Sequence, residues 1–434
     1  MVSPVSEEIS CRVSRCSSPR QCFHATDFKR DRDWLSATRV VNVDRNEDAG
    51  SSADNKFAPL EGEFLRTPKE TGMKQSRQAV AAALVPHLAP STIGLDLGDR
   101  WSRYCVVDEN GVVVAEDRIR TCASALARRF QRLPSRQVVV EAGTHSPWVG
   151  RLLASLGHRV VVANARKVRL IYESDRKNDR LDARMLARLG RVDVSLLAPI
   201  QHRSAEAQAD LAVVRGRDAL VAARTQMINA VRGMVKTAGG RLPKSTTAAF
   251  PRKALPWIPP ELRRAMAPLL ESVRVLSEQI HRADRQIRAL ADEKYPETKL
   301  LRQVKGIGPL IALTYVLTLE NPYRFAKSRT VGSYLGLRPR QRESGDSAAQ
   351  LGISKAGNHQ LRWLLVQAAH YILGPLAPDS GLRRWGLELA ARGGKNGKRR
   401  AVVAVARKLA VLLHRLWVTA EVYEPLYGIE SEAA

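Results

Sequence analysis

Apolar positions become periodic only after residue 88, where the first strand-like patterns begin. Residues 1–88 are polar and charged, and we expect them to form a disordered extension without a core of their own. Short apolar runs occupy 92–97, 104–108 and 112–116, and the Asn110-Gly111 pair between the last two is typical of a hairpin turn. This part of the sequence therefore predicts a meander of three strands.

The residues that follow alternate between helical and extended patterns. Helices are predicted at 123–133 and 147–156, and strands at 137–141 and 159–163. Three strands, helix, strand, helix, strand is the order of a ribonuclease-H-like fold, although the pattern by itself leaves other α/β folds open. We therefore predict an α/β domain over residues 89–200.

The middle of the chain, residues 201–298, is predicted to be helical, after a further helical stretch at about 166–190. A helix at 205–237 is followed by a Gly239-Gly240 break and a proline-rich stretch. Beyond them apolar residues recur at heptad spacing, at Leu269, Val273, Leu276, Ile280, Ala283, Ile287 and Leu290. This seam predicts a coiled coil or an antiparallel helical hairpin, and hence a dimer or tetramer; the alternative is a single amphipathic helix packed on its own domain.

A mostly helical second domain is predicted over residues 299–426, before a short tail at 427–434. It opens with Lys305, Gly306 and Gly308 in a pattern typical of a helix-hairpin-helix motif. Glycines at such a turn let backbone N–H groups approach a phosphate. A plain turn between two helices is the alternative interpretation.

The chain is strongly basic, with 70 Lys and Arg residues against 43 Asp and Glu residues and a net charge of +27. Such an excess favours a polyanionic partner, with nucleic acid as the first choice. The first residues have no signal-peptide pattern, and no stretch is apolar for the roughly 20 residues of a membrane span. We expect a cytoplasmic protein that does not contact membranes.

Four carboxylates carry the candidate chemistry. Asp96 and Glu141 each end an apolar strand, and Asp179 and Asp182 are three residues apart on one face of a predicted helix. Oxygen ligands of this kind suit Mg²⁺ or Mn²⁺, which can stabilise charge during phosphoryl transfer. Exposed acids at strand ends and solvated Asp/Arg pairs on a helix are the alternative interpretations.

Three segments around these acids resemble the DEDD tetrad of the IS110 family of insertion-sequence transposases. They read Ile-Gly-Leu-Asp96, Val-Val-Glu141-Ala-Gly-Thr and Asp179-Arg-Leu-Asp182-Ala-Arg-Met-Leu. The second domain is similar as well, at 306–308, 333–345 and 353–362, so the resemblance covers roughly residues 90 to 420. It implies a catalytic domain similar to Holliday-junction resolvases of the RuvC type.

The resemblance also implies a serine nucleophile in the second domain, which would form a covalent phosphoserine link to DNA. The matching residue is Ser344, with Ser347 and Ser354 as nearby alternatives. It further implies donor and target DNA as partners, together with a structured non-coding bridge RNA that pairs with both. Basic groups that would hold phosphates are Arg338, Arg340, Arg342, Lys355 and Arg362.

Two other functions are compatible with the same residues. A hydrolytic nuclease or junction resolvase would use the four acids with water as nucleophile. A non-catalytic DNA- or RNA-binding protein would need only the positive charge.

Overall fold

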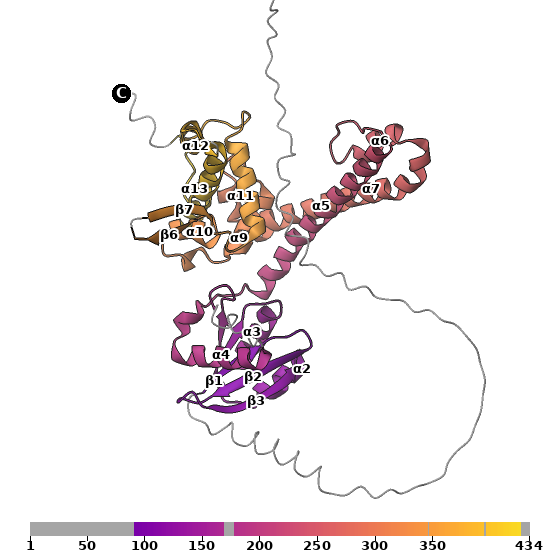
Figure 1. Ribbon diagram of the computed structural model, residues 1–434. Helices are drawn as coiled ribbons and strands as arrows, with labels where there is room; N and C mark the ends of the chain where they lie inside the picture. The colour runs from indigo at the N-terminus through magenta and orange to yellow at the C-terminus, as the bar shows by residue number, and fades with distance from the viewer. Residues whose placement is uncertain (1–90, 169–177, 346, 395, 427–434) are drawn as a thin grey trace, which may run out of the picture. The chain divides into compact units, whose positions relative to one another are not determined.

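The computed structural model describes residues 91–168, 178–345, 347–394 and 396–426, which belong to one compact unit of the chain (Figure 1). The predicted extension at 1–88 and the tail at 427–434 lie outside the described residues. None of the helices described is both long and apolar enough to cross a membrane.

A five-stranded mixed sheet forms the first part of the described chain. Its strands are β1 (Thr92–Asp96), β2 (Trp101–Val107), β3 (Val113–Arg120), β4 (Gln137–Glu141) and β5 (Arg159–Ala163). The order across the sheet is β3-β2-β1-β4-β5, with β1 antiparallel to β2 and parallel to β4. All five strands lie close to where the sequence predicts them, and this mixed order agrees with the predicted ribonuclease-H-like fold.

Helices cover both faces of this sheet. On one face, Val138 and Val140 share a core with Leu126 of α2 (Ala123–Phe130) and Val149 of α3 (Ser146–Ser155). On the other face, Val139 shares a core with residues of α4 (Asp179–Val192) and of the short helix η4 (Val194–Leu197). Alternate residues of β4 thus point to opposite layers, as the period of a strand requires.

Helix α4 begins later than the pattern predicts. A helix was expected over about 166–190, but residues 165–167 form a turn and helix α4 begins at Asp179. Asn178 is the N-cap, because its side-chain oxygen accepts a hydrogen bond from the backbone N–H of Arg180 at 3.0 Å. The segment 169–177 lies outside the described residues.

The middle of the chain is an antiparallel helical hairpin of α5 (Ala205–Thr237) and α7 (Pro260–Ala289), joined through α6 (Phe250–Ala254) and η5 (Leu255–Trp257) (Figure 1). Val235 near the end of α5 shares a core with Met266 near the start of α7. Nearer the open end of the hairpin, Arg217 pairs with Asp284 at 2.8 Å. Of the two predicted arrangements, the structure therefore has the antiparallel helical hairpin within one chain.

The predicted heptad seam lies largely inside this hairpin. Val273, Ile280 and Ile287 are buried, whereas Leu270 and Ser277 are buried in place of the half-buried Leu269 and Leu276. Their apolar side is covered by α5 of the same chain. The seam therefore gives no support for assembly, and a dimer or tetramer would need another surface.

The C-terminal part is mostly helical, as expected. After η6 (Leu290–Lys294), its helices are α8 (Thr298–Leu301), α9 (Pro309–Leu319), η7 (Pro322–Arg324), α10 (Arg329–Tyr334), α11 (His359–Ile372), α12 (Gly381–Ala391) and α13 (Gly397–Thr419). Helix α9 lies at the centre, because its residues from Ala312 to Leu319 are buried. It is tied to α13 by the hydroxyl of Tyr315, which donates to the carbonyl oxygen of Ala410 at 2.6 Å.

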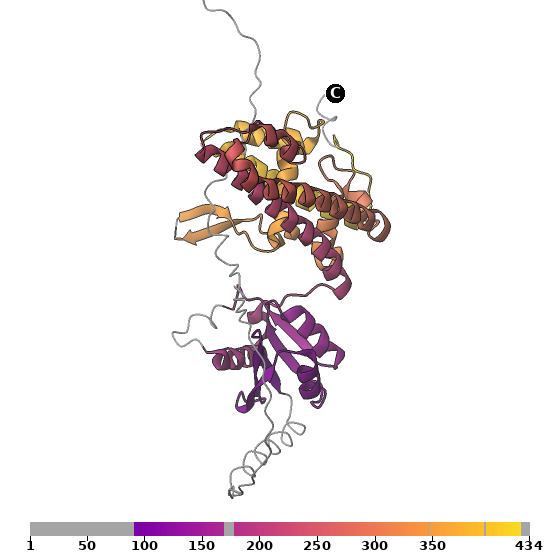
Figure 2. The same cartoon turned by 90° about the vertical axis from the view of Figure 1, so that its right-hand side faces the viewer.

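A β-hairpin interrupts these helices, and the sequence did not predict it. Strand β6 (Pro339–Ser344) pairs with β7 (Ser347–Ile353) in antiparallel register, and Figure 2 shows the hairpin standing out from the helices. Strand β6 is polar, and in β7 only Leu351 and Ile353 alternate as large apolar residues, so the pattern is too short to predict a half-buried strand.

Candidate active site

Asp96 and Glu141 come to the same edge of the sheet because their strands are parallel neighbours. The register pairs Gly94 with Val139 and Leu95 with Val140, so the next residue on each strand is one of the two acids. Parallel strands end at the same edge of a sheet, and adjacent strands are about 4.8 Å apart. The two acids therefore stand side by side where β1 and β4 end.

Both acids also belong to the α4 face of the sheet. Leu95 packs into the core under α2 and α3, whereas Val139 packs with α4. Because alternate residues of a strand share a face, Asp96 lies on the same face as Gly94 and Glu141 on the same face as Val139. Strand alternation thus directs the two carboxylates towards the helix that carries the other two.

Helix α4 runs antiparallel to β1 and lies directly against it. A Cβ atom added at Gly94 would overlap the carbonyl oxygen of Ala183 and stand 2.5 Å from the backbone nitrogen of Ala187. One added at Gly190 would overlap Cγ2 of Val139 and stand 3.5 Å from Cγ2 of Thr92, near the start of β1. The later residues of α4 thus lie near the start of β1, and its first turn lies towards the end of β1.

This direction brings Asp179 and Asp182 to the edge that holds the strand acids. Asp179 precedes Ala183 by four helical residues, which is about 6 Å along the axis. Asp96 follows Gly94 by two strand residues, which is about 7 Å in the same direction. All four acids of the predicted tetrad are therefore positioned at one end of the sheet.

The four acids offer only oxygen donors, which fits a hard divalent cation such as Mg²⁺ or Mn²⁺. Within the described residues, however, no three carboxylate, imidazole or thiol groups converge closely enough to hold a metal ion. The backbone thus brings the tetrad together at one edge, but its side chains do not form a closed cage.

Glu116 on β3 holds the first turn of α4, and the sequence did not reveal this role. Its side chain, 11% exposed, accepts hydrogen bonds from Nε of Arg180 at 2.6 Å and from Nη2 and Nε of Arg184. The hydrogen bonds from Arg184, with those from Arg180, lower the pKa of Glu116 to about 2 although burial opposes them. Arg180 and Arg184 flank Asp182, so this cluster of three side chains fixes the turn that carries two of the acids.

A second contact missed by sequence reasoning lies just after the strand ends. The indole N–H of Trp148 donates to Nδ1 of His145 at 3.0 Å, which leaves the proton of a neutral imidazole on Nε2. That nitrogen faces a carboxylate oxygen of Asp99 at 3.6 Å. His145 follows Glu141 by four residues and Asp99 follows Asp96 by three, so the pair lies beside the acidic edge.

Ser344 is at the tip of the β6–β7 hairpin. Its backbone pairs with that of Ser347, and the chain reverses between them through Gly345, which has a φ of +54°. The left-handed conformation at this turn favours glycine. The side chain of Ser354 is exposed beyond the other end of β7.

The basic residues predicted near Ser344 differ in exposure. Arg338, Arg340, Arg342 and Lys355 are exposed on or beside the hairpin. Arg362 is only 7% exposed and donates to the carbonyl oxygens of Leu335 at 2.9 Å and Ala356 at 2.7 Å. Burial, together with the charge of Arg166, lowers the pKa of Arg362. Arg362 therefore hydrogen-bonds to backbone carbonyl oxygens and does not face solvent.

Helix α11 begins at His359, after the exposed Ser354 at the end of the hairpin. Asn358 is the N-cap, and its side-chain oxygen accepts from the backbone N–H of Leu361 at 3.0 Å. Ser354 lies too far from the first turn to reach its free N–H groups.

The Gly306-Ile-Gly308 turn joins the four-residue helix α8 to α9. A Cβ atom at Gly306 would stand 2.8 Å from Cδ1 of Tyr371, so this glycine lets α11 approach the turn. Gly308 faces open space and Lys305 is exposed, which leaves that side of the turn accessible. The helix-hairpin-helix function of this turn stays a prediction.

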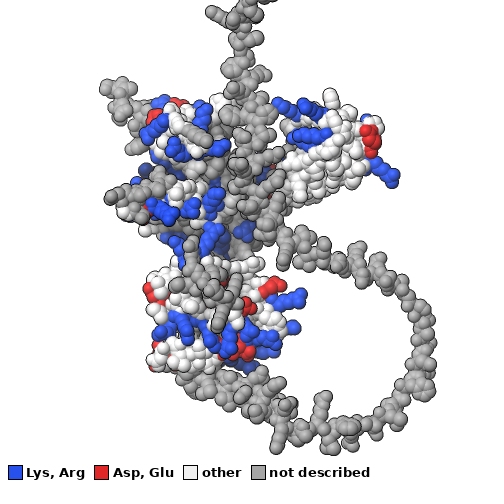
Figure 3. Space-filling model, in the orientation of Figure 1, with Lys and Arg blue, Asp and Glu red and all other residues white. Residues whose placement is uncertain are grey.

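Positive side chains are spread over the face of the C-terminal helical part shown in Figure 3, where acidic side chains are fewer. This distribution follows from the net charge of +27. A surface of this kind attracts phosphate backbones without reading base sequence.

Comparison with known proteins identifies two family models along the chain. Residues 93–239 match a DEDD-type transposase model of the IS110 group, and residues 298–378 match the model of the transposase IS116/IS110/IS902 family. The first range contains all four tetrad acids, and the second contains the β6–β7 hairpin.

The chain is also similar to curated transposases. It is 30% identical to a probable family 20 transposase of Pseudomonas aeruginosa over 343 residues, which cover 77% of this chain and 99% of that protein. It is 28% identical to the transposase for insertion sequence element IS1111A of Coxiella burnetii, over 76% of this chain and 90% of the relative. The transposase for IS1328 of Yersinia enterocolitica is 29% identical, over 68% and 87% respectively.

Proposed function

The chain belongs to the IS116/IS110/IS902 family of transposases, enzymes that cut and rejoin DNA, and on this basis we propose that two groups of residues share the chemistry. The tetrad Asp96, Glu141, Asp179 and Asp182 would hold a divalent metal ion. Ser344 would be the nucleophile that attacks a phosphodiester of the DNA. The observation that carries this proposal is the gathering of the four acids at one edge of the sheet.

The proposed first step is a transesterification. The Oγ atom of Ser344 forms a bond to phosphorus, the bond from phosphorus to a deoxyribose oxygen breaks, and the released sugar hydroxyl takes up a proton. The hydroxyl of another DNA end then attacks the phosphoserine, forms the new phosphodiester and returns the serine hydroxyl. Phosphodiester bonds are conserved, so no nucleotide cofactor is consumed.

Each group has a stated task in this scheme. A divalent ion bound by the tetrad would stabilise negative charge on the phosphate under attack. Ser344 is supported as nucleophile by its place at the hairpin tip, next to a glycine turn that leaves the backbone accessible. Exposed Arg340 and Arg342 on the same strand could bind the phosphate oxygens.

The test of the nucleophile is trapping of the covalent intermediate. Wild-type protein and Ser344→Ala are incubated with end-labelled DNA and Mg²⁺ or Mn²⁺, and denaturing electrophoresis detects label attached to protein. We expect an adduct with the wild-type chain and none with Ser344→Ala, while the matched variants Ser347→Ala and Ser354→Ala still form it. An adduct that persists in Ser344→Ala would move the chemistry to another residue.

The same gel separates the hydrolytic alternative. A nuclease that uses water would give labelled DNA fragments with both the wild-type chain and Ser344→Ala, and an adduct with neither. Asp96→Ala, Glu141→Ala, Asp179→Ala and Asp182→Ala should each abolish cleavage in either scheme. If three of these four variants cut DNA at normal rates, the metal-site assignment is wrong.

We further propose that a structured bridge RNA guides the protein to donor and target DNA, and that the active form is a dimer or tetramer. The net charge of +27 supports binding of two nucleic acids at once. Nuclease treatment of the purified protein tests the RNA. We expect recombination to stop after treatment and to resume when the RNA encoded beside the gene is added, whereas full activity on DNA without RNA contradicts this proposal.

A further inference from the structure

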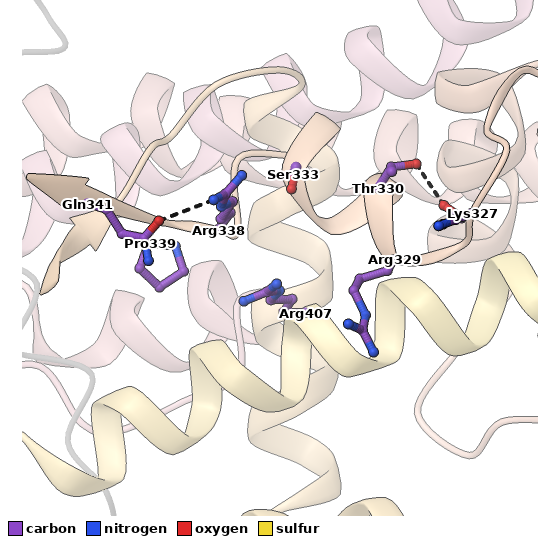
Figure 4. A pocket seen from close by; sticks show the side chains of 8 residues that line it. All are labelled: Lys327, Arg329, Thr330, Ser333, Arg338, Pro339, Gln341 and Arg407. Carbon is purple, nitrogen blue, oxygen red and sulfur yellow. Dashed lines mark hydrogen bonds between the residues drawn. The ribbon is translucent and has the colours of Figure 1, made fainter. Parts of the chain in front are cut away.

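A basic pocket of about 450 Å³ lies beside the hairpin that carries Ser344 (Figure 4). Its cationic side chains come from separate segments: Lys327 and Arg329 at the start of α10, Arg338 just before β6, and Arg407 on α13. The residues that line it in the described part of the chain include no Asp or Glu. The tertiary fold, rather than a run of basic sequence, gathers these charges.

Some arginines of the described chain are neutralised by acids, but the four cations of the pocket are not. Arg217, Arg274 and Arg384, for example, each form an ion pair with a carboxylate. Among the residues that the structure describes, neither Lys327, Arg329, Arg338 nor Arg407 forms one. Like charges gathered without a counterion repel one another, so an anion bound among them would relieve the repulsion.

Arg407 is held in place before any ligand arrives. It is half-buried, and its stem packs against α10 where a Cβ atom added at Gly332 would stand 3.0 Å from Cγ of Arg407. On the hairpin side, Nη2 of Arg338 donates to Oε1 of Gln341 at 3.2 Å. Groups whose positions are set by packing and hydrogen bonds lose less freedom when they bind, which favours binding.

The pocket and Ser344 are connected by β6. Gln341 lines the pocket, and Ser344 follows it by three residues on the same strand. Three strand residues span about 10 Å, which equals about three nucleotide steps along the axis of a DNA strand. A DNA strand that presents one phosphate to Ser344 can therefore present a phosphate a few nucleotides away to this pocket.

We propose that the pocket formed by Lys327, Arg329, Arg338 and Arg407 binds a backbone phosphate of the DNA, a few nucleotides from the phosphodiester that Ser344 attacks. The position relative to the attacked bond rests on the proposed function; the binding of DNA phosphate does not. Guanidinium groups suit this ligand because their planar fork matches two phosphate oxygens. The site would fix the position of the strand without reading its sequence.

The experiment measures how the affinity of the full-length protein for a labelled DNA duplex depends on salt. The variants are Arg329→Gln, Arg407→Gln and the double variant, and the matched control is Arg264→Gln, an exposed arginine on α7 outside the pocket. Each phosphate contact contributes about 0.9 to the slope of log affinity against log salt concentration. Because the pocket binds one phosphate, we expect each single variant to reduce the slope by up to about 0.9, the double variant to reduce it by about 0.9 in total, and Arg264→Gln to leave it unchanged.

The slope has a direct consequence for affinity. Between about 50 and about 200 mM NaCl, the loss of this one phosphate contact makes the drop in affinity about 3.5-fold smaller. Arg329 is exposed at the start of α10, so Arg329→Gln should fold normally even if Arg407→Gln does not. Slopes equal to wild type in both single variants would overturn the proposal.

Two further measurements identify the ligand and test the pocket independently of the proposed nucleophile. A labelled RNA of the same length replaces the DNA; a slope that changes for RNA only would assign the pocket to RNA and overturn the DNA proposal. Ser344→Ala should keep the wild-type slope with DNA. If no adduct depends on Ser344 but the slopes change as expected, the phosphate pocket is supported and Ser344 as nucleophile is refuted. If the adduct depends on Ser344 but the slopes do not change, the nucleophile is supported and the phosphate pocket is refuted.

Discussion

Replacing Glu116 by glutamine should loosen the helix turn that carries Asp179 and Asp182. The variant keeps the size of the side chain but removes the charge that binds Arg180 and Arg184. The lowering of the Glu116 pKa from 4.5 to about 2 corresponds to about 3 kcal/mol, and because Arg180 is 55% exposed we expect about 2 kcal/mol to be lost.

Hydrogen–deuterium exchange with peptide resolution measures this loss locally. A loss of about 2 kcal/mol in the opening of α4 should speed the exchange of its protected amides by about 30-fold at pH 7. Amides of the α5–α7 hairpin should exchange at the wild-type rate. The matched control is Glu109→Gln, an exposed glutamate in the turn between β2 and β3, which should leave α4 unchanged.

The effect should depend on pH in a defined direction. Because the pKa of Glu116 is lower in the folded than in the unfolded chain, its stabilisation is present above pH 4.5 and is lost as the pH falls towards 2. By about pH 3 less than half of the difference between wild type and Glu116→Gln should be left, with both proteins compared at the same pH. Equal protection of α4 in both proteins at pH 7, or a difference that is unchanged at pH 3, would refute the reasoning.

Three other outcomes are expected. Gly94→Ala should displace α4 and abolish DNA cleavage, because the added Cβ overlaps the carbonyl of Ala183; Gly143→Ala, which meets open space, should cleave normally. At pH 8, iodoacetamide should label exposed Cys122 but not Cys105, since burial raises the pKa of Cys105 to about 12; peptide mass spectrometry distinguishes them, and equal labelling would contradict the burial. RNA binding should weaken steeply with salt, and a flat response in a titration would argue against phosphate contacts.

The sequence was sufficient to locate the strands and the acids that follow them. The core strands β4 and β5 were predicted with the bounds that the structure has, because their apolar runs are short and bounded by polar residues. The acids Asp96 and Glu141 were visible for the same reason, as charged residues at the ends of buried strands. Asp179 and Asp182 were visible as a pair one helical turn apart.

Helix packing was harder to predict, because it depends on which surfaces meet. The heptad pattern in α7 is compatible with a partner helix from another chain or from the same one, and the pattern itself does not distinguish them. In the fold, α5 covers the seam, and two of its positions shift from Leu269 and Leu276 to Leu270 and Ser277.

The tertiary structure alone decided the contacts between residues far apart in the chain. Glu116 contacts Arg180 across 64 residues, and Arg407 lines one pocket with Arg329 and Arg338, which are 78 and 69 residues away in the sequence. No local periodicity in the sequence could therefore predict either cluster. The β6–β7 hairpin, which carries Ser344, is held by backbone pairing, and its apolar alternation is too short to predict it from the sequence. Local sequence patterns indicate which residues face a core. Which charged residues pair with one another depends instead on how the helices and strands pack together in the tertiary structure.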